Sequence, residues 1–539
     1  MKLADVLKDA FIRAGVELPK KLKYKKKATK HKWNKTDQTI NCPIKTKTKK
    51  QSELKGAAAT EIKNRILVEP DARFTWQPSE SKKNLLLDLP LTGKKVALAQ
   101  KPGEKILCIG LDFGTSTLKA VITDNERNIS YAIPFRNELN VNRYLLPCRV
   151  SLDRNKYGLT TGGIVYQDLK LSLIENPENI NQQTHVIAFL ALALQKIRAW
   201  LLSEHGKTYS ETLVWDLAVG LPIAHTGNNV LTRVYKKLSI AAWIASTNDI
   251  LTTESIANAL ERAKELEAGK KIEFENEDIE VSVKPEIAAQ IYGFVSSGAY
   301  DPSGKNFYLM VDVGAGTLDA SVFRIEKAKG KIKTNLVLFK TTVEPHGVMN
   351  LHKKRMDWLE SALQENHPER KDLLESVAES KSIIDVLKPL PNIIDQYFKG
   401  VECKPFDEGV DNNFYKKVKT QVSGHTYYQT WKERLLGSND MKMPMFLCGG
   451  GSRWCFYSKL QEQMKEYPGY TYLGVSPRQL QQPQKLIASG LNEKDYDRLS
   501  VAFGLSKLKL GDVTMDVEPL PLEVKKSDYA DKYVDSSQV

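Results

Sequence analysis

The sequence predicts an α/β protein made of two related halves. Residues 106–122 (ILCIGLDFGTSTLKAVI) contain two apolar stretches joined by a short polar turn, which is typical of two strands and a tight connection. A similar turn recurs at residues 312–320, again directly after an apolar stretch at 307–311. Between the two copies, apolar residues recur at helical spacing over residues 185–202. Strands that alternate with helices predict an α/β architecture, and a repeat at so large a spacing favours two half-domains over a solenoid.

The first turn carries the residue types of a phosphate-binding loop. Its glycine lets the backbone approach a ligand closely, while hydroxyl and backbone N–H groups can surround phosphate oxygens. A lysine adds positive charge, and an aspartate at the end of the strand suits a hard cation such as Mg²⁺. The alternative is a glycine-containing hairpin with ordinary turn residues. The residues concerned are Asp112, Gly114, Thr115, Ser116, Thr117 and Lys119.

The second turn repeats the pattern of the first. Residues 112–120 read DFGTSTLKA and residues 312–320 read DVGAGTLDA, so Asp, Gly, Thr, Leu and Ala occupy the same relative positions. Two loops of this kind that face each other would clamp a triphosphate together with its metal ion. The second copy adds Asp312, Gly314, Ala315, Gly316 and Thr317 to the predicted site.

Three further motifs accompany the two turns: VKPEIAAQIYG (283–293), FLCGGGSR (446–453) and RLSVAFGLS (498–506). In this order, the five motifs resemble the actin-like ATPase superfamily, most closely the ATPase domain of the seventy-kilodalton heat-shock chaperones. The turns are similar to its two phosphate motifs, residues 446–453 to its adenosine motif, and the other two segments to its connecting helices. The resemblance implies a duplicated, ribonuclease H-like fold with two lobes around a nucleotide cleft.

The resemblance also implies ligands and residue roles. The ligands would be ATP or ADP with Mg²⁺, and Asp112 and Asp312 would hold the metal through its water shell. Thr317 and Asp312 would orient the attacking water, and Arg453 would stack on the adenine. The implied catalytic residues are therefore Asp112, Asp312, Thr317 and Glu286. The implied nucleotide contacts are Gly114, Thr115, Ser116, Thr117, Lys119, Gly314, Ala315, Gly316, Gly449, Gly450, Gly451, Ser452 and Arg453.

One position departs from the chaperone pattern. The first connecting motif of the chaperones begins Glu-Pro, and its Glu is associated with the catalytic water. Here Lys284 precedes Pro285, and the nearest carboxylate, Glu286, lies two residues further on. A shift of two residues at a helix start redirects a side chain. The sequence therefore supports nucleotide binding better than rapid hydrolysis.

The basic character of the chain is concentrated in its first 50 residues. The net charge is +14, and residues 1–50, with fifteen Lys and one Arg against four acidic residues, carry +12 of it. Such a block is typical of a disordered interaction tail. Tyr24 and Trp33 interleave with the lysines, which suits stacking on single-stranded nucleic acid. The alternative is a solvated tail without a specific partner, because charge by itself specifies little.

Length and composition indicate a protein of several domains. A chain of 539 residues, 41% hydrophobic, is long enough for two or more domains. Its longest apolar run, residues 186–194, is shorter than the roughly 20 residues that span a bilayer, so we expect no membrane association. No apolar signal core and no CxxC pair occur, which favours a cytoplasmic protein without structural zinc. We expect a basic, largely disordered tail (1–50), an extension (51–104), a first half (105–300), a second half (301–510) and a C-terminal tail (511–539).

Three expectations concern residues outside the motifs. Residues 51–104 are punctuated by prolines and are expected to add a strand or two to the first half. His346 and His352 lack further ligands at metal-binding spacing, so a surface or helix-cap role is expected. In the chaperones a helix of the second half contacts the adenosine, and the corresponding candidates here are Glu379, Lys381 and Ser382.

The leading functional hypothesis is a molecular switch similar to the heat-shock chaperones. ATP would close the two halves, hydrolysis to ADP and phosphate or release would open them, and an unidentified partner protein would respond to the change. The residues after Leu508 are too few for a peptide-binding β-sandwich. The alternatives are an actin-type filament former and a nucleotide-binding scaffold with negligible turnover. A small-molecule kinase ranks last, because no substrate-side catalytic aspartate stands out.

Overall fold

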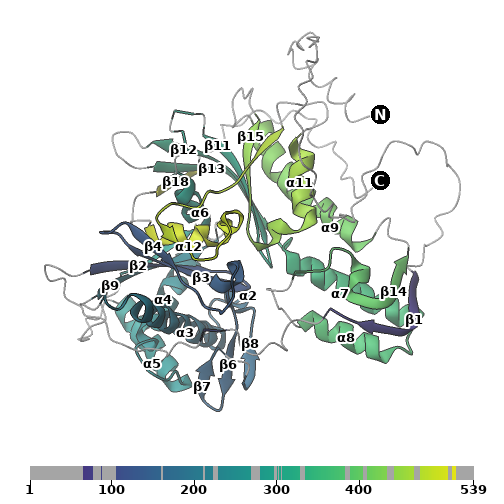
Figure 1. Cartoon of the computed structure of the whole chain (residues 1–539), viewed down its shortest axis with the longest axis horizontal. Helices are drawn as coiled ribbons and strands as arrows, with labels where there is room; N and C mark the ends of the chain where they lie inside the picture. The colour runs from purple at the N-terminus through teal and green to yellow at the C-terminus, as the bar shows by residue number, and fades with distance from the viewer. Residues whose placement is uncertain are drawn as a thin grey trace, which may run out of the picture.

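The protein is a mixed α/β structure in which two large sheets lie on either side of helices α6 (Glu286–Val295) and α12 (Asp497–Lys507) (Figure 1). We describe the fold from a computed structural model of the chain. It describes residues 65–76, 86–87, 105–159, 162–209, 213–222, 229–268, 280–295, 300–301, 303–304, 306–327, 334–382, 389–404, 409–433, 442–465, 474–507 and 513–517.

The first sheet has its strands in the order β10, β9, β2, β3, β4 and β17, with the short β5 also paired to β3. Strands β2 and β3 form an antiparallel hairpin, which β4 extends in antiparallel fashion. On the other side, β9 and β10 run parallel to β2, and β17 runs parallel to β4 at the far edge. The strands are β2 (Lys105–Phe113), β3 (Thr117–Asp124), β4 (Ile129–Ala132), β5 (Leu146–Pro147), β9 (Leu213–Leu221), β10 (Glu280–Pro285) and β17 (Leu486–Ile487).

The second sheet has the order β16, β15, β11, β12, β13 and β18. Strands β11, β12 and β13 are successively antiparallel, β15 and β16 run parallel to β11, and β18 runs parallel to β13. The strands are β11 (Phe307–Val313), β12 (Leu318–Lys327), β13 (Thr334–Glu344), β15 (Met443–Cys448), β16 (Val475–Arg478) and β18 (Val513–Val517).

The two sheets therefore share one strand order and one set of strand directions. In each, the repeated turn joins the two strands of the central hairpin. Part of the predicted C-terminal tail belongs to the second sheet, because residues 513–517 form β18. The basic tail at residues 1–50 lies outside the described residues.

Four helices and a small sheet complete the first lobe. Its core joins the apolar faces of β2, β3 and β9 to α3, α4 and α5. Helix α3 is long and apolar enough to cross a bilayer, but most of it is buried inside the lobe. The elements are α2 (Leu169–Glu175), α3 (Ile180–His205), α4 (Asn229–Ala245), α5 (Thr253–Glu267), β6 (Val150–Asp153), β7 (Lys156–Gly158) and β8 (Ile164–Tyr166).

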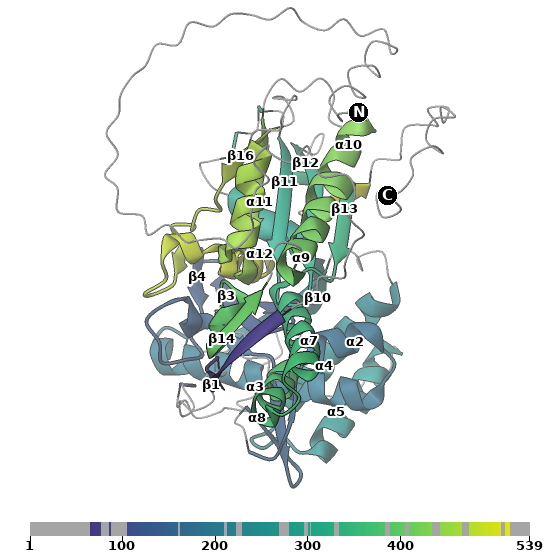
Figure 2. The same ribbon diagram turned by 90° about the vertical axis from the view of Figure 1, so that its right-hand side faces the viewer.

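The second lobe packs a different set of helices on its sheet. Its core joins β11, β12 and β15 to α9, α11 and the π-helical segment η4. Helices α7 and α8 form a separate cluster at one end of the molecule with β1 and β14 (Figures 1 and 2). The elements are α7 (Val348–Asn366), α8 (Lys371–Ser382), β14 (Phe398–Lys404), α9 (Val410–Lys419), η4 (Thr420–Tyr428), α10 (Gln429–Lys432) and α11 (Cys455–Lys465).

The expectation for residues 51–104 is wrong for the longest described strand of that segment. β1 (Arg65–Phe74) pairs antiparallel with β14, beside α7 and α8, and not with the first half (Figure 2). Trp76 is buried there and its Nε1 donates to the carbonyl of Pro389. Within the described part of the segment, the first half receives the bridge between Leu86 and Arg136 and hydrogen bonds at Leu87, but no strand. No local pattern predicts this pairing, because β1 and β14 are more than 300 positions apart.

His346 and His352 are buried, so the expected surface position is wrong for both. His346 Nδ1 lies 2.8 Å from Gln421 Oε1, and His352 Nδ1 lies 2.9 Å from the hydroxyl of Tyr397. Burial lowers the pKa of His352 to about 4, which keeps its ring neutral near pH 7. Both histidines thus connect elements of the second lobe through hydrogen bonds.

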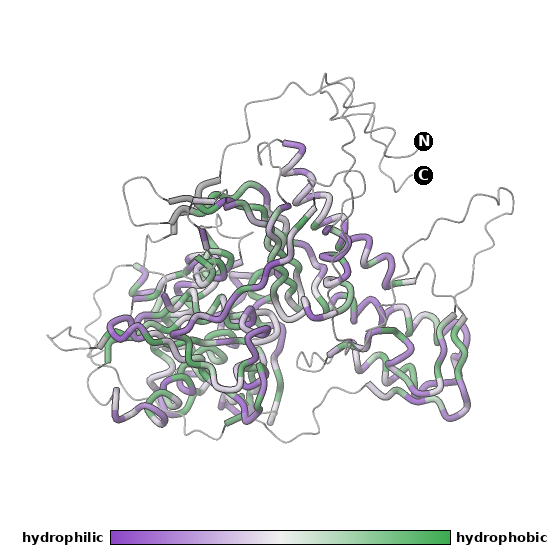
Figure 3. The backbone as a smooth tube through the Cα atoms, turned by 45° about the horizontal axis from the view of Figure 1, so that its top comes forward, coloured by the Kyte–Doolittle hydropathy of each residue, from purple (hydrophilic) through white to green (hydrophobic). Residues whose placement is uncertain are grey.

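Helices α6 and α12 bring the two lobes into contact. In Figure 3 the apolar segments gather inside the lobes, and α6 and α12 complete that interior. α6 packs on residues of the second sheet, whereas α12 lies on the first sheet over Gly110, where a Cβ would come 2.1 Å from Ala502 O. The helices also cross closely, since a Cβ on Gly504 would come 1.8 Å from Ala289 O. The end of the segment predicted as the second half therefore packs on the first lobe, because its small residues allow close approach.

Candidate functional site

Each repeated turn is closed by the same backbone hydrogen bond. Gly114 N–H donates to Thr117 O at 3.2 Å in the first turn, and Gly314 N–H donates to Thr317 O at 2.9 Å in the second. Both turns follow a strand whose last residues include an aspartate, so the equivalent residues of the two copies occupy equivalent places. The repeat seen in the sequence is therefore also a repeat of local backbone structure.

The two turns line one cavity of about 560 Å³. This volume lies in the range typical of small-ligand pockets. Of the predicted site residues, those that line it are Asp112, Gly114, Thr115, Ser116, Thr117, Lys119, Glu286, Asp312, Gly314, Ala315, Thr317, Gly449, Gly450, Gly451 and Arg453.

Two predicted residues do not line the cavity. Gly316 lies against the first turn instead, where a Cβ would come 3.5 Å from Thr115 Cγ2. Ser452 donates its hydroxyl hydrogen to the carbonyl of Gly449 at 2.8 Å. This hydrogen bond stabilises the turn at residues 449–453, which follows β15 and is the third turn of the site. Gly316 therefore lies close to Thr115, so the two repeated turns are neighbours.

Two ion pairs hold charged side chains at the wall of the cavity. Lys119 Nζ lies 2.8 Å from Asp112 Oδ2, and both side chains are almost fully buried. Lys170 Nζ, from α2, lies 2.7 Å from Oε1 of Glu286, the first residue of α6. Burial disfavours the charged form of Lys170, but the neighbouring Glu286 outweighs it and the pKa of Lys170 is raised. The raised pKa keeps Lys170 charged near pH 7 beside Glu286.

Asp312 and Asp319, unlike Asp112 and Glu286, form no ion pair with a described lysine or arginine. Gln290 Nε2 donates to Asp312 Oδ2 at 2.9 Å, while Oδ1 of Asp319 is buried without a hydrogen-bond partner. Burial raises the pKa of Asp312 to about 6, against the opposing hydrogen bond from Gln290. Burial, and then the charge of Asp312, raise the pKa of Asp319 to about 7. The two carboxylates thus form the least compensated negative charge at the cavity wall.

The third turn, which follows β15, brings its backbone close to the second repeated turn. Gly449 has φ of +84°, and a Cβ there would come 2.2 Å from Asp312 Oδ1. Its N–H donates to Asp497 Oδ2 at 3.0 Å. Only glycine accommodates both the positive φ and the contact with Asp312. The CGGGSR sequence is therefore explained by the approach of this turn to the carboxylate.

Arg453 is held by carboxylates at the rim of the cavity. Its Nη2 lies 2.6 Å from Asp497 Oδ1 and 2.9 Å from Asp495 Oδ1. These pairs orient the guanidinium, and stacking on an adenine remains a prediction. Of the looser candidates for adenosine contact, neither Glu379 nor Lys381 is among the lining residues, and Lys381 pairs with two carboxylates of α7.

The sequence reasoning missed several residues that line the cavity. Asp319 is the last acidic letter of DVGAGTLD, and Gln290 lies one helical turn after Glu286, so both were within the motifs. Arg498 is the first residue of the motif at residues 498–506, but it was not predicted as a site residue, and Lys170 comes from a segment to which no role was assigned. Lys284, the residue that departs from the chaperone pattern, is not among the lining residues, whereas Glu286 is.

Comparison with known proteins adds no assignment. No protein-family profile matches the chain, and no curated protein matches it at a significant level. The chemistry of the cavity is therefore inferred from its own residues.

The charges of the cavity favour a ligand that carries a cation. Among its described lining residues are six carboxylates and four cationic side chains. No group of three or more His, Cys, Asp or Glu side chains in the described part of the chain is arranged to hold a metal ion alone. Mg²⁺ is commonly bound by one or two carboxylates together with waters and phosphate oxygens, which this arrangement provides for. The cavity is thus suited to a phosphorylated ligand that brings a divalent cation with it.

Proposed function

We propose that the protein is an actin-like ATPase that binds ATP or ADP with Mg²⁺ between its two lobes. In this proposal the two sheets are the two copies of a duplicated, ribonuclease H-like fold. The observation that carries it is the convergence of the two repeated turns on one cavity. The matching strand orders of the two sheets and the close approach of Gly316 to Thr115 support two facing phosphate loops.

The turns offer the groups that phosphate oxygens need. Ser116 Oγ is buried without a hydrogen-bond partner, and Thr115, Ser116 and Thr117 all line the cavity. Backbone N–H groups and hydroxyls of this kind bind phosphate without adding net charge. In the proposal the first turn contacts one side of the phosphate chain and Gly314, Ala315 and Thr317 contact the other.

Asp112, Asp312 and Asp319 are the groups that would hold Mg²⁺. Their oxygens are hard ligands, and a bound cation would offset the burial that raises the pKa values of Asp312 and Asp319. When bound, Mg²⁺ would neutralise charge on these carboxylates and on the phosphates.

Hydrolysis would join a water oxygen to the terminal phosphorus and break that phosphorus's bond to the bridging oxygen, giving ADP and phosphate. Catalysis of this kind depends mainly on positioning and electrostatics. Glu286, Asp319 and Thr317 line the cavity and are placed to orient the water or to accept its proton.

We further propose that the two lobes change their separation with the bound nucleotide and that an unidentified partner protein responds. Helices α6 and α12 lie between the two sheets, so a change in the separation of the lobes would act on their packing. The basic arm at residues 1–50 is suited to nucleic acid or to an acidic partner. A nucleotide-binding scaffold with negligible turnover is the second candidate, because Glu286 is already engaged by Lys170.

The test is calorimetric titration of the full chain with ATP and ADP in MgCl₂, followed by measurement of phosphate release. We expect saturable binding of both nucleotides, and its loss in Asp312→Asn combined with Thr117→Val. A matched control is Asp301→Asn, which removes an exposed carboxylate outside the cavity. Absence of binding by the wild-type chain would contradict the proposal. Binding without phosphate release would favour the scaffold, and ATP-dependent sedimentation would favour the filament former.

A further inference from the structure

Three of the four cationic side chains that line the cavity are matched by carboxylates. Lys119 pairs with Asp112, Lys170 with Glu286, and Arg453 with Asp495 and Asp497. Arg498 is the fourth. Its guanidinium forms no ion pair or hydrogen bond with any described residue, which distinguishes it from the other three.

The position of Arg498 directs it to the third turn. It is the second residue of α12, and its guanidinium lies flat against Gly450, where a Cβ would come 2.7 Å from Nη1 and 2.9 Å from Cζ. Gly450 and Arg498 both line the cavity. A side chain at position 450 would displace the guanidinium, so the glycine and the arginine share one space. The start of a helix also favours an anion nearby, because its N–H groups point outward.

An arginine in this place is unfavourable without an anion. Arg498 is partly buried, and burial and then the charge of Arg453 lower its pKa, against the opposing charges of Asp497, Asp112 and Asp312. Burying a cation without a partner costs free energy, which an anionic ligand can offset by hydrogen bonding to the fork of the guanidinium. The most favourable partner is a phosphate group, which accepts two parallel hydrogen bonds from arginine.

The carboxylates in the neighbourhood do not fill this role. Asp497 is engaged by Arg453 and by Gly449 N–H, and Asp112 is engaged by Lys119. Asp312 accepts from Gln290 and lies against Gly449. The charge of Arg498 therefore remains available to a molecule in the cavity.

We propose that Arg498 binds a phosphate of the diphosphate part that ATP and ADP share. This inference rests on the proposed function, and it names a contact from α12 in addition to the three turns. Because Gly450 belongs to the turn expected at the ribose, the phosphate concerned is one near the ribose and not the terminal one. Arg498 thus contributes to holding the nucleotide in both states of the ATPase cycle.

The experiment compares wild-type protein with Arg498→Gln and Arg498→Lys in MgCl₂, by titration with ATP, ADP and adenosine. A charged hydrogen bond of this kind makes a difference of roughly 10- to 100-fold in affinity. We expect Arg498→Gln to weaken ATP and ADP binding by a similar factor in this range and to leave adenosine binding unchanged. Arg498→Lys should be intermediate, because it keeps the charge and loses the paired hydrogen bonds.

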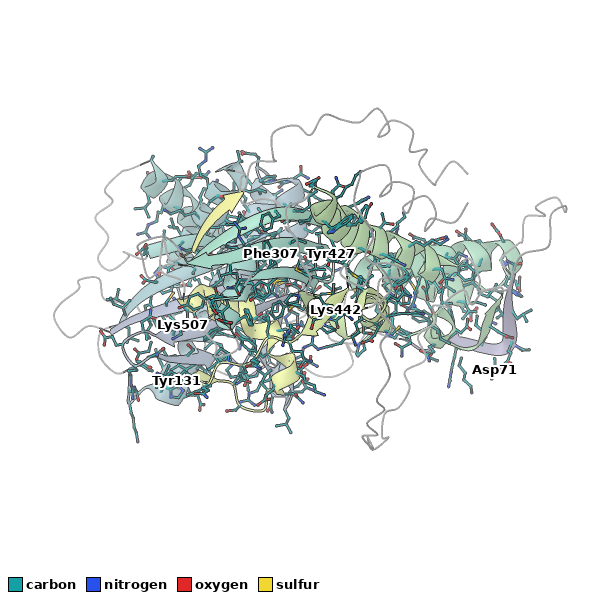
Figure 4. The ribbon with its side chains drawn as sticks, turned by 90° about the horizontal axis from the view of Figure 1, so that it is seen from above. Asp71, Tyr131, Phe307, Tyr427, Lys442 and Lys507 are labelled. Carbon is teal, nitrogen blue, oxygen red and sulfur yellow. The ribbon has the colours of Figure 1, made fainter. Side chains whose placement is uncertain are left out.

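The matched control is Lys507→Gln at the other end of α12, where the side chain donates to Asn128 (Figure 4). It removes one positive charge from the same helix, and we expect unchanged affinities. If Arg498→Gln and the wild type bound the nucleotides equally, the inference about Arg498 would be overturned and the proposed function would stand. If the wild-type chain bound neither nucleotide, the proposed function would fail first.

A second measurement separates ligand binding from a structural role. Because the guanidinium has no partner in the described chain, ligand-free Arg498→Gln should melt at the same temperature as wild type or higher. A clearly lower melting temperature, or failure to fold, would show that Arg498 is paired within the chain and would overturn the inference. In that case the melting temperature of Arg498→Lys shows whether the pairing depends on the positive charge or on the planar guanidinium.

Discussion

Lys170 Nζ lies 2.7 Å from Glu286 Oε1, and this pair joins α2 of the first lobe to the first residue of α6. Glu286 also lines the cavity, so a carboxylate two residues after Lys284 reaches the place where the ligand would lie. The orientation comes from the helix start and from the buried lysine that holds the side chain. The ion pair with Lys170 thus holds this carboxylate at the cavity wall.

Replacing Glu286 by Gln tests whether it takes part in hydrolysis. We expect the rate of phosphate release to fall by about 100-fold, the scale of a lost proton-transfer group, with ATP affinity little changed. Glu280→Gln is the matched control, because Glu280 is exposed on the neighbouring strand β10 and does not line the cavity. Unchanged turnover in Glu286→Gln would exclude a catalytic role for this side chain.

Removing magnesium tests the excess of carboxylates at the cavity wall. Because six carboxylates face four cations, the triphosphate alone meets net negative charge. We expect the affinity for ATP to fall by about tenfold or more when EDTA replaces MgCl₂. The dependence should be weaker in Asp319→Asn, which removes one of the carboxylates. Equal affinities with and without the metal would contradict a role for Asp312 and Asp319 in holding it.

The raised pKa of Asp319 predicts a pH dependence of stability. Its value of about 7 in the folded protein exceeds the ordinary value of 3.8, so the folded state binds the proton more tightly. The contribution is fully present at low pH and is lost as the pH rises toward 7. In the absence of ligand, Asp319→Asn should therefore melt several degrees higher than wild type at pH 8, with a smaller difference at pH 5. Scanning calorimetry across this range would detect it, and a difference independent of pH would show the assignment to be wrong.

The contact of Gly449 with Asp312 predicts a severe effect of a single methyl group. A Cβ at position 449 would lie 2.2 Å from Asp312 Oδ1 at a positive φ, so Gly449→Ala should displace the carboxylate or strain the turn. We expect loss of Mg²⁺-dependent nucleotide binding and a destabilisation of about 2 kcal/mol. Gly162→Ala is the control, because nothing lies within 4 Å of its Cβ position. Nucleotide affinity that survives Gly449→Ala would argue against the proposed place of the third turn.

The N-terminal extension is expected to stabilise the cluster of α7 and α8. Trp76 is buried against His352 and Tyr397, so Trp76→Ala should destabilise that cluster by about 3 kcal/mol. Hydrogen exchange should rise in α7 and α8 and not in α3. Leu67→Ala, on the same extension but half exposed, is the control and should have little effect. Figure 4 places this end of the molecule, marked by Asp71, far from Lys507 in α12. Exchange that rises equally in both lobes would contradict a local role.

Much of the site was predictable because its residues are close together in the chain. Asp112 to Lys119 and Asp312 to Thr317 lie within short turns, where glycine, hydroxyl and carboxylate at fixed spacing restrict what the backbone can do. The pairing of β2 with β3 and of β11 with β12 follows from the same local order. Gly316 and Ser452 belong to the same turns but face away from the cavity, which spacing does not reveal.

The sequence by itself determined the two turns, the strands that carry them and the helices that begin the connecting segments. These depend on neighbours a few residues apart, whose preferences add up locally. Only the tertiary structure decided that β1 joins β14, that Lys170 meets Glu286, and that Arg498 enters the cavity beside Gly450. Such contacts join segments tens to hundreds of residues apart, and their energy comes from burial and charge in a packed interior that no local pattern records.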